Sequence, residues 1–299
     1  MTPTASDTDS SEMPPALDVA DATRTVEIAV GSVPVVDHGD GPVVLLLHGM
    51  PDSRHLWRYQ IPALVDAGFR VVAPDLRGFG DAPKPDGVEA YALPTVMEDV
   101  VGLLHVMGIT TVNLVGHDWG AGVGWLLAAT QPDFVDRLVA LSVGAPGNSL
   151  TRTIEQHERS WYVYFFQFEG VAEAWLRHDD WQLFREWTRG DGDLERYLAD
   201  LSRPGALTSA LNWYRANLRP EEPARSGFDY PNVTCPVLGI WSDGDHYLTE
   251  GYMTGSTEKV DGPWRYERIT DASHWLMLDK PGELNDLLVE FLRDSSTED

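Results

Sequence analysis

One aspartate occupies the position of the reactive residue in a motif typical of a nucleophile. Asp118 lies in Gly116-His117-Asp118-Trp119-Gly120-Ala121, directly after the apolar run 111–115 and before a helical pattern that begins at Val123. Small residues on both sides of a nucleophile permit a sharp strand-to-helix turn that lifts its side chain above the sheet edge. The motif is weak alone, but its place between a buried strand and a helix strengthens the prediction.

A carboxylate at this position favours attack on an alkyl carbon rather than an acyl carbon. It can displace a leaving group and form an ester, which water then cleaves at the carbonyl. A serine attacking the same carbon would form an ether that water does not cleave. Asp118 therefore predicts a substrate such as an epoxide or an alkyl halide. The competing interpretation is an aspartate that only caps the following helix.

Such a nucleophile requires a histidine base and an orienting acid, in the chain order nucleophile, acid, histidine. The histidines that follow Asp118 are His157, His178, His246 and His274. We predict His274 as the base, because it lies in a loop after a strand-like run, where α/β sheets place their chemistry. Asp245 is the predicted acid, and Asp243 is the alternative.

A second turn can stabilise negative charge near Asp118. His48-Gly49-Met50-Pro51 follows a strand-like run, and a tight turn there can aim the Met50 backbone N–H at the same point as that of Trp119. Each donor of such an oxyanion hole typically contributes ~3 kcal/mol when water attacks the ester. An ordinary turn is the competing interpretation. The predicted supporting residues of the two turns are His48, Gly49, Pro51 and His117.

The surrounding elements predict an α/β fold with a mostly parallel central sheet. Apolar runs of strand length, typical of strands buried on both faces, occur at residues 43–47, 70–74, 111–115, 134–143 and 236–241. Residues 93–107 and 283–292 have helical spacing, and two short strands flank Gly31. Strands that alternate with helices indicate βαβ units.

Residues 147–230 interrupt this alternation. They have helical patterns without a buried-strand run and hold five of the eleven tryptophans. Because strand-like runs stand on both sides, we interpret them as a helical cap inserted into a core of residues 23–146 and 231–299, rather than as a separate helical domain. Residues 1–22 form a predicted flexible tail, since they begin with a polar stretch that lacks the apolar region of a secretory signal.

The composition argues against several classes of partner. The 299 residues include 22 Lys and Arg against 47 Asp and Glu, a formal net charge of −25. This charge disfavours nucleic acid and anionic membranes, and no apolar stretch approaches the ~20 residues of a membrane helix. Cys235 is the only cysteine, which excludes an intrachain disulfide and a cysteine-based metal cluster and favours a cytoplasmic location.

From about Thr25 to Arg293 the chain resembles the epoxide hydrolases of the α/β-hydrolase fold. The motifs that carry the resemblance are His48-Gly-Met-Pro51, Asp75-Leu-Arg-Gly-Phe-Gly80, Gly116–Ala121, Asp245, and His274-Trp275 with Asp279-Lys-Pro281. Haloalkane dehalogenases share part of these motifs, so the motifs leave the substrate open.

Two cap tyrosines favour an epoxide. Trp161-Tyr-Val-Tyr-Phe-Phe-Gln167 resembles the segment with the first ring-opening tyrosine of epoxide hydrolases, which matches Tyr162, with Tyr164 as the alternative. Leu211-Asn-Trp-Tyr-Arg215 resembles the segment with the second, at Tyr214. An opening epoxide needs a proton on its oxygen, which a phenol can supply, whereas a halide departs without one.

The resemblance implies hydrolysis of a small apolar or aryl epoxide to a vicinal diol, through a covalent ester on Asp118 and with no metal or organic cofactor. The aromatic cap predicts a pocket lined by Trp119, Trp161, Phe166 and Trp213. The alternative is a haloalkane or haloacid dehalogenase that uses the same Asp118, His274 and Asp245. A non-enzymatic ligand receptor is the third hypothesis, and we expect a monomer or a homodimer.

Overall fold

The computed structural model describes residues 14–220 and 230–294 of the chain. Eight strands form one sheet in the order β1-β2-β4-β3-β5-β6-β7-β8. The pairs β1–β2 and β2–β4 are antiparallel, and all other neighbours are parallel. The strands are β1 (Thr23–Ile28), β2 (Gly31–His38), β3 (Val43–Leu47), β4 (Arg70–Pro74), β5 (Val112–His117), β6 (Val135–Leu141), β7 (Val237–Ser242) and β8 (Trp264–Ile269).

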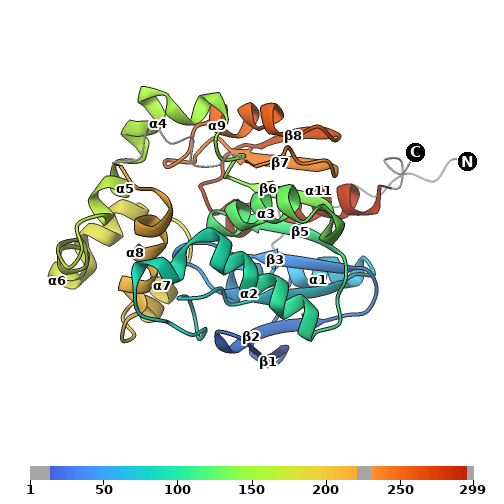
Figure 1. Ribbon diagram of the computed structural model, residues 1–299, viewed down its shortest axis with the longest axis horizontal. Coiled ribbons are helices and arrows are strands. Elements are labelled where there is room, and N and C mark those ends of the chain that lie inside the picture. The colour runs from blue at the N-terminus through green and yellow to red at the C-terminus, as the bar shows by residue number, and fades with distance from the viewer. Residues whose placement is uncertain (1–13, 221–229, 295–299) are drawn as a thin grey trace, which may run out of the picture.

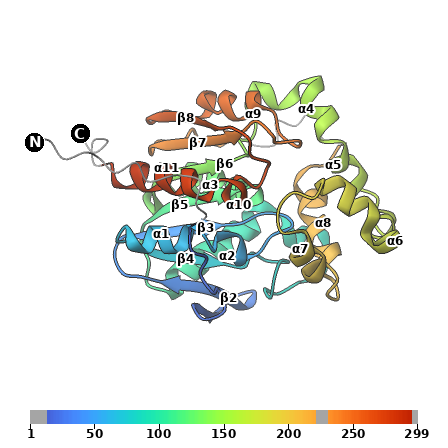
Figure 2. The same ribbon diagram turned by 180° about the vertical axis from the view of Figure 1, so that it is seen from behind.

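Helices cover both faces of this sheet. α2 (Leu93–Val106) and α3 (Trp119–Thr130) lie on the face turned to the viewer in Figure 1. α1 (Gln60–Asp66) and α11 (Pro281–Arg293) lie on the opposite face, which Figure 2 turns to the viewer. β5 and β7 are buried along their whole length because helices flank them on both sides. The predicted α/β fold with a mostly parallel sheet is thus confirmed.

A group of helices between β6 and β7 lies beyond one end of the sheet (Figure 1). They are α4 (Ile154–Arg159), α5 (Trp161–Phe166), α6 (Val171–Thr188), α7 (Leu194–Leu201) and α8 (Ala206–Asn217). The described part of this segment contains no strand, as its helical patterns predicted. Its role as a cap distinct from the core stays a prediction.

Shorter helices join these elements. Two are single α-turns near the sheet edge, α9 (Glu250–Thr254) and α10 (Leu276–Asp279). The 3₁₀ helices are η1 (Arg54–Trp57), η2 (Val88–Tyr91), η3 (Pro132–Phe134), η4 (Ser149–Arg152) and η5 (Gly255–Lys259). Within the described ranges, no helix combines the length and apolarity that a membrane span requires.

Two sequence-based boundaries were wrong. β6 ends at Leu141, before the predicted end at residue 143, because Ser142 has a left-handed φ of 65° that terminates the strand. The inner end of the predicted flexible tail packs on the core: Val19 is buried, and the Leu17 N–H donates to the Arg58 carbonyl at 2.8 Å. Residues 1–13 of that tail lie outside the described ranges.

Candidate active site

Asp118 lies on a sharp turn between β5 and α3. Its φ of 50° and ψ of −120° are a strained conformation for a residue with a side chain. Glycines make the turn possible: a Cβ on Gly116 would lie 2.5 Å from the Gly120 carbonyl oxygen, and one on Gly120 would lie 2.0 Å from that of Leu47. The close approach of α3 to β3 and β5 therefore lifts Asp118 above the sheet edge.

The Asp118 carboxylate contacts both amides of the predicted oxyanion hole. The Met50 N–H donates to Oδ1 at 2.8 Å, and the Trp119 backbone N–H also hydrogen-bonds the carboxylate. Gly49 permits this approach, because a Cβ there would lie 2.2 Å from Oδ1. Oδ1 therefore already occupies the position in which an oxyanion would be stabilised.

His48 braces the turn that carries Met50. It is buried, its Nε2 accepts the Leu76 N–H at 2.9 Å, and its Nδ1 hydrogen-bonds the Gly49 carbonyl at 3.0 Å. Burial lowers the pKa of His48 to about 4, so the ring is neutral and can accept at one nitrogen while it donates at the other. Pro51 follows in a cis peptide bond with Met50.

His274 lies between two carboxylates. Its Nδ1 donates to Asp245 Oδ2 at 2.8 Å, and its Nε2 lies 3.9 Å from Asp118 Oδ2. Asp245 is 1% exposed, whereas the alternative acid Asp243 is exposed and accepts the N–H of Asp271. The carboxyl ends of β5, β7 and β8 thus bring together Asp118, Asp245 and His274, and Asp243 stays outside.

The other histidines that follow Asp118 are exposed, although His157 also lines the cavity that contains Asp118. His246 is exposed although it adjoins Asp245. His178 is exposed on α6 and pairs with Asp179 at 3.0 Å. His157 hydrogen-bonds the Tyr164 hydroxyl rather than a carboxylate. Of the four candidates, His274 alone combines a contact with an acid and a position facing Asp118.

Burial and charge set the protonation of Asp118 and His274. Burial raises the pKa of Asp118 above its ordinary value, although the charge of His274 and the amides of Met50 and Trp119 act in the opposite direction. Burial alone would lower the pKa of His274, but the charge and hydrogen bond of Asp245, followed by the charge of Asp118, raise it. The loss of either negative charge would therefore lower the pKa of His274.

Side chains at three strand ends hold the loop of His274. His117 at the end of β5 hydrogen-bonds the His274 carbonyl through Nε2 at 3.0 Å, and the Ser142 hydroxyl donates to the same carbonyl at 3.1 Å. The Ser242 hydroxyl donates to the Ser273 carbonyl at 2.6 Å. No sequence motif indicated Ser142, since a lone serine at a strand end carries no recognisable pattern.

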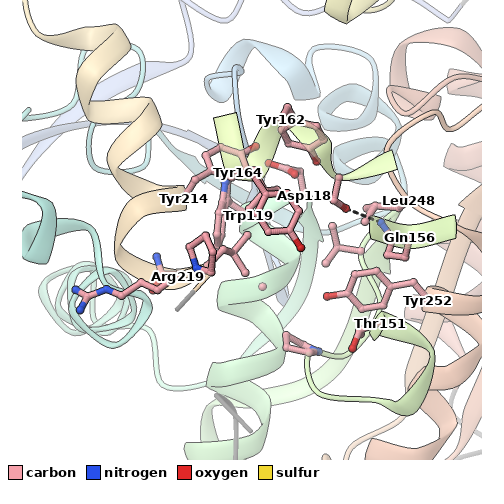
Figure 3. Close-up of a pocket in the computed structure, with 18 of the residues that line it drawn as sticks. Asp118, Trp119, Thr151, Gln156, Tyr162, Tyr164, Tyr214, Arg219, Leu248 and Tyr252 are labelled. Atoms are coloured by element: carbon pink, nitrogen blue, oxygen red, sulfur yellow. Dashed lines mark hydrogen bonds between the residues drawn. The ribbon is translucent and has the colours of Figure 1, made fainter. Parts of the chain in front are cut away.

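Tyr162 on α5 and Tyr214 on α8 line the same cavity as Asp118 (Figure 3). Their ring centroids lie 5.8 Å apart at an interplanar angle of 80°. Burial, followed by the charge of Asp118, raises the pKa of both phenols well above the usual range, so both keep their protons. The alternative Tyr164 also lines the cavity, but it is 41% exposed and its hydroxyl lies 2.7 Å from Nδ1 of His157.

A buried ion pair joins the helices that carry the two tyrosines. Arg215, which follows Tyr214 on α8, donates to the two oxygens of Glu173 on α6 at 2.8 and 3.0 Å. Its Nε also donates to the Phe166 carbonyl on α5 at 2.8 Å. The side chains of Arg215 and Glu173 are 5% and 9% exposed. One guanidinium therefore fixes α5, α6 and α8 relative to one another.

A cavity of about 420 Å³ opens over Asp118 (Figure 3). Of the predicted pocket residues, only Trp119 lines it; the prediction was wrong for Trp161, Phe166 and Trp213. Trp161 is 47% exposed, because one residue along α5 from Tyr162 is about 100° around the helix. Phe166 lies one turn further along α5 and packs behind Tyr162, and Trp213 is fully buried.

The cavity also has lining residues that no sequence motif indicated. Tyr252 on α9 and Thr151 on η4 supply hydroxyl groups, and Leu248 and Val143 supply apolar surface. They come from segments that follow β6 and β7 without a recognisable pattern. Tertiary packing alone brings them to the cavity.

Comparison with known proteins agrees with this fold. Residues 42–281 match the family described as the alpha/beta hydrolase fold. The AB hydrolase superfamily protein YfhM of Bacillus subtilis is 34% identical over 265 residues, which cover 85% of this chain and 91% of YfhM. Epoxide hydrolase A of Mycobacterium tuberculosis is 33% identical over 301 residues, which cover 86% of this chain and 93% of that protein.

Solved structures extend the similarity. The crystal structure of epoxide hydrolase A from Mycobacterium thermoresistibile has a TM-score of 0.76 and 31% identity, covering 91% of this chain and 98% of that chain. The crystal structure of a Bacillus megaterium epoxide hydrolase with an inhibitor has a TM-score of 0.82 and 28% identity, covering 91% and 100%. The chain belongs to the α/β-hydrolase fold family and, within it, to the epoxide hydrolases.

Proposed function

We propose that this enzyme hydrolyses an epoxide to a vicinal diol through a covalent ester on Asp118. One observation carries the proposal: Asp118 shares a cavity with two protonated phenols, Tyr162 and Tyr214. A carboxylate can attack carbon, and a phenol can protonate the oxygen that leaves that carbon. Both groups that ring opening requires therefore face the same space.

In the first half-reaction, Asp118 Oδ2 attacks a ring carbon and the bond between that carbon and the epoxide oxygen breaks. The oxygen accepts a proton from Tyr162 or Tyr214. The resulting ester is neutral, so the Asp118 charge that raised the pKa of both phenols disappears. The phenolate left by proton transfer is therefore more stable in the intermediate than in the free enzyme.

In the second half-reaction, His274 Nε2 takes a proton from water, and the hydroxide attacks Cγ of Asp118. Negative charge develops on Oδ1, which the Met50 amide already contacts at 2.8 Å, with the Trp119 amide as the second donor. The tetrahedral species collapses and expels the diol oxygen. The two protons of the water, one held by His274 and one on the new Asp118 carboxyl, then go to the diol oxygen and to the tyrosine phenolate, which restores the Asp118 carboxylate. The net reaction is epoxide plus water to diol.

We infer that residues 147–230 act as a cap that completes the site. The triad residues follow strands of the sheet, whereas both tyrosines come from α5 and α8. The aromatic rings around Tyr162 and Tyr214 favour an apolar or aryl epoxide as the substrate. We further propose that the protein is cytoplasmic and that it is a monomer or a homodimer. Light scattering of the purified protein would test the oligomeric state.

The alternative is a dehalogenase on the same triad, and one observation favours it. The indole N–H of Trp119 lies near the Tyr214 hydroxyl but makes no hydrogen bond of full geometry with the described residues, so it could donate to a halide. The neighbouring Met50 side chain is a thioether, which donates no proton and so offers a halide no second side-chain donor. The tyrosine pair also has no function in halide release, so we rank this alternative second.

Product analysis separates the two functions. Purified enzyme is given styrene oxide and a linear alkyl epoxide in one arm, and chloro-, bromo- and iodoalkanes in the other. We expect diol from the epoxides and no halide release above the rate of the Asp118→Asn variant. Halide release without diol from any epoxide would reject the proposed function in favour of the alternative.

A further inference from the structure

Tyr252 supplies another hydroxyl to the cavity, and the mechanism above does not use it. Tyr252 on α9 points into the space over Asp118, across from Tyr162 and next to Thr151 (Figure 3). Tyr252 is half-buried, whereas Tyr162 and Tyr214 are 7% and 4% exposed. The hydroxyl makes no hydrogen bond with the part of the chain that the structure describes. Among the described residues it is therefore a donor without a partner.

The backbone that carries Tyr252 is rigidly held. Its carbonyl accepts the Asn148 side-chain amide at 3.0 Å, and its N–H hydrogen-bonds Thr249 through the side-chain oxygen at 3.2 Å. Asn148 is 1% exposed, and its backbone carbonyl accepts the Thr151 hydroxyl at 2.9 Å. One buried asparagine thus fixes Tyr252 and Thr151 relative to each other. The Thr151 oxygen donates to Asn148 and keeps its acceptor capacity for the cavity.

The electrostatics of the cavity determine what this pair can bind. Burial, followed by the negative charge of Asp118, raises the pKa of Tyr252, so its hydroxyl keeps its proton. The same negative charge disfavours an anionic substituent. Arg219, the cationic guanidinium in the lining, is ion-paired with Glu89. The preferred partner of the Tyr252 hydroxyl is therefore a neutral acceptor.

We propose that Tyr252 and Thr151 form a second polar subsite that binds a neutral oxygen in the substituent of the epoxide. An ether, an ester carbonyl or a hydroxyl group would satisfy the unpartnered Tyr252 donor, and a hydroxyl could also donate to Thr151. The inference rests on the proposed function and narrows its substrate class to oxygen-substituted epoxides. It adds a specificity-determining residue that is distinct from the ring-opening tyrosines.

An oxygen scan with the Tyr252→Phe variant tests the subsite. The substrates are linear terminal epoxides of equal length. Each carries one ether oxygen in place of a methylene, at a different position along the chain, and the all-carbon epoxide is the parent. For each substrate, kcat/KM of the variant is divided by that of the unaltered enzyme, which cancels intrinsic reactivity. A neutral hydrogen bond predicts a loss of about tenfold at one or two oxygen positions, mainly in KM, and less than twofold for the parent.

Two further variants complete the test: one probes Thr151, and the other is a control outside the cavity. Thr151→Val is expected to reduce kcat/KM for a hydroxyl-substituted epoxide at the same position. Tyr266→Phe removes a hydroxyl that donates to Glu250 and that lies outside the cavity lining, so it should leave the oxygen preference unchanged. Because the Tyr252 hydroxyl has no partner in the described part of the chain, Tyr252→Phe should unfold at the same temperature as the unaltered enzyme.

The possible results are distinguishable. A Tyr252→Phe effect that is equal for every substrate, the parent included, would overturn the subsite and leave epoxide hydrolysis intact. A ratio of kcat/KM near one between Tyr252→Phe and the unaltered enzyme for every substrate would also overturn the subsite and leave epoxide hydrolysis intact. If the unaltered enzyme hydrolyses no epoxide of the series, the proposed function fails and the subsite fails with it.

Discussion

Oδ2 of Asp245 accepts a hydrogen bond from Nδ1 of His274 at 2.8 Å, and its other oxygen is held by two backbone amides. Those amides belong to Tyr247 and Leu248, at 2.8 and 2.9 Å. The acid therefore cannot rotate away from the base, and the imidazole is fixed with Nε2 facing Asp118. Asp245 therefore affects His274 in two ways: its hydrogen bond orients the ring, and its charge raises the pKa of the ring. One substitution changes both, and the rate and its pH dependence report them separately.

Asp245→Asn is expected to slow hydrolysis of the ester by ~10²–10⁴-fold, because the amide no longer fixes the imidazole in the productive tautomer. The pH below which the rate of ester hydrolysis falls should also be lower than in the unaltered enzyme. The charge of Asp245 raises the pKa of His274, so its removal lowers the pH below which the base is protonated. Rapid-quench measurement of ester decay across pH reports both effects.

Asp243→Asn is the matched control for this substitution. Asp243 precedes Asp245 by two residues but is exposed, and its Oδ1 accepts the Asp271 N–H, which an asparagine oxygen can also accept. Ester decay should stay within about twofold of the unaltered rate. A fall in the rate of Asp245→Asn that began at higher pH, or a larger loss in the control, would contradict the assignment of Asp245.

Tyr162→Phe and Tyr214→Phe should each slow ester formation, by ~10²-fold or more, because each removes one of the two acids that protonate the epoxide oxygen. Ester hydrolysis should change much less, since His274 drives that step. Pre-steady-state measurement of ester formation and decay separates the two steps. Tyr164→Phe should leave ester formation within twofold, because its hydroxyl bonds His157; a larger loss there than in Tyr162→Phe would reverse the assignment.

Glu173→Gln should destabilise the fold by about 3–5 kcal/mol at neutral pH, since it leaves the buried Arg215 without its charge partner. Urea unfolding measures this difference. Glu186→Gln, a neutralisation on the exposed surface of α6 beyond its kink at residues 178–181, should change stability by less than about 1 kcal/mol. Equal stability of Glu173→Gln and the unaltered protein would show that the ion pair does not hold the helices together.

The stability difference between Glu173→Gln and the unaltered protein should also depend on pH. Burial raises the pKa of Glu173, but the hydrogen bonds and charge of Arg215 outweigh burial and lower it below the ordinary 4.5. Its contribution is therefore fully present above pH 4.5 and is lost as pH falls through the lowered pKa of the folded state. The stability gap between Glu173→Gln and the unaltered protein should narrow in that acid range; a gap that widened there would contradict this sign.

Ser142→Ala should slow ester hydrolysis by about fivefold, because the His274 carbonyl loses one neutral hydrogen bond. The loss should be modest, since His117 still contacts that carbonyl at 3.0 Å. Ser142→Gly also lacks the hydroxyl but accepts the φ of 65° without strain, so it should be more stable than Ser142→Ala to thermal unfolding. Faster hydrolysis in either variant would rule out a positioning role for Ser142.

Sequence reasoning was most accurate where one local rule decides the structure. The apolar runs predicted β3, β5 and β7 because strands covered by helices on both faces need apolar side chains throughout. The turn at Asp118 was predictable because only small residues fit at Gly116 and Gly120. These features depend on a few neighbouring residues and are therefore visible in the sequence.

The cavity lining was less predictable because it depends on helix phase and tertiary packing. Aromatic content alone selected Trp161 and Phe166, but the phase of α5 directs Tyr162 to the cavity and turns Trp161 toward solvent. Tyr252 reaches the cavity through the packing of α9 against Asn148, which no motif encodes. Ser142 has a positive φ, which the presence of a serine in the sequence does not predict.

A single turnover in ¹⁸O-labelled water tests the covalent Asp118 ester most directly. Enzyme in excess converts one equivalent of epoxide, and mass spectrometry then locates the label in the diol and in the peptide that contains Asp118. We predict unlabelled diol and one ¹⁸O in Asp118, because the oxygen that joins the substrate comes from the carboxylate and water replaces it. Labelled diol with unlabelled Asp118 would mean that water attacks the epoxide directly, and would contradict the mechanism.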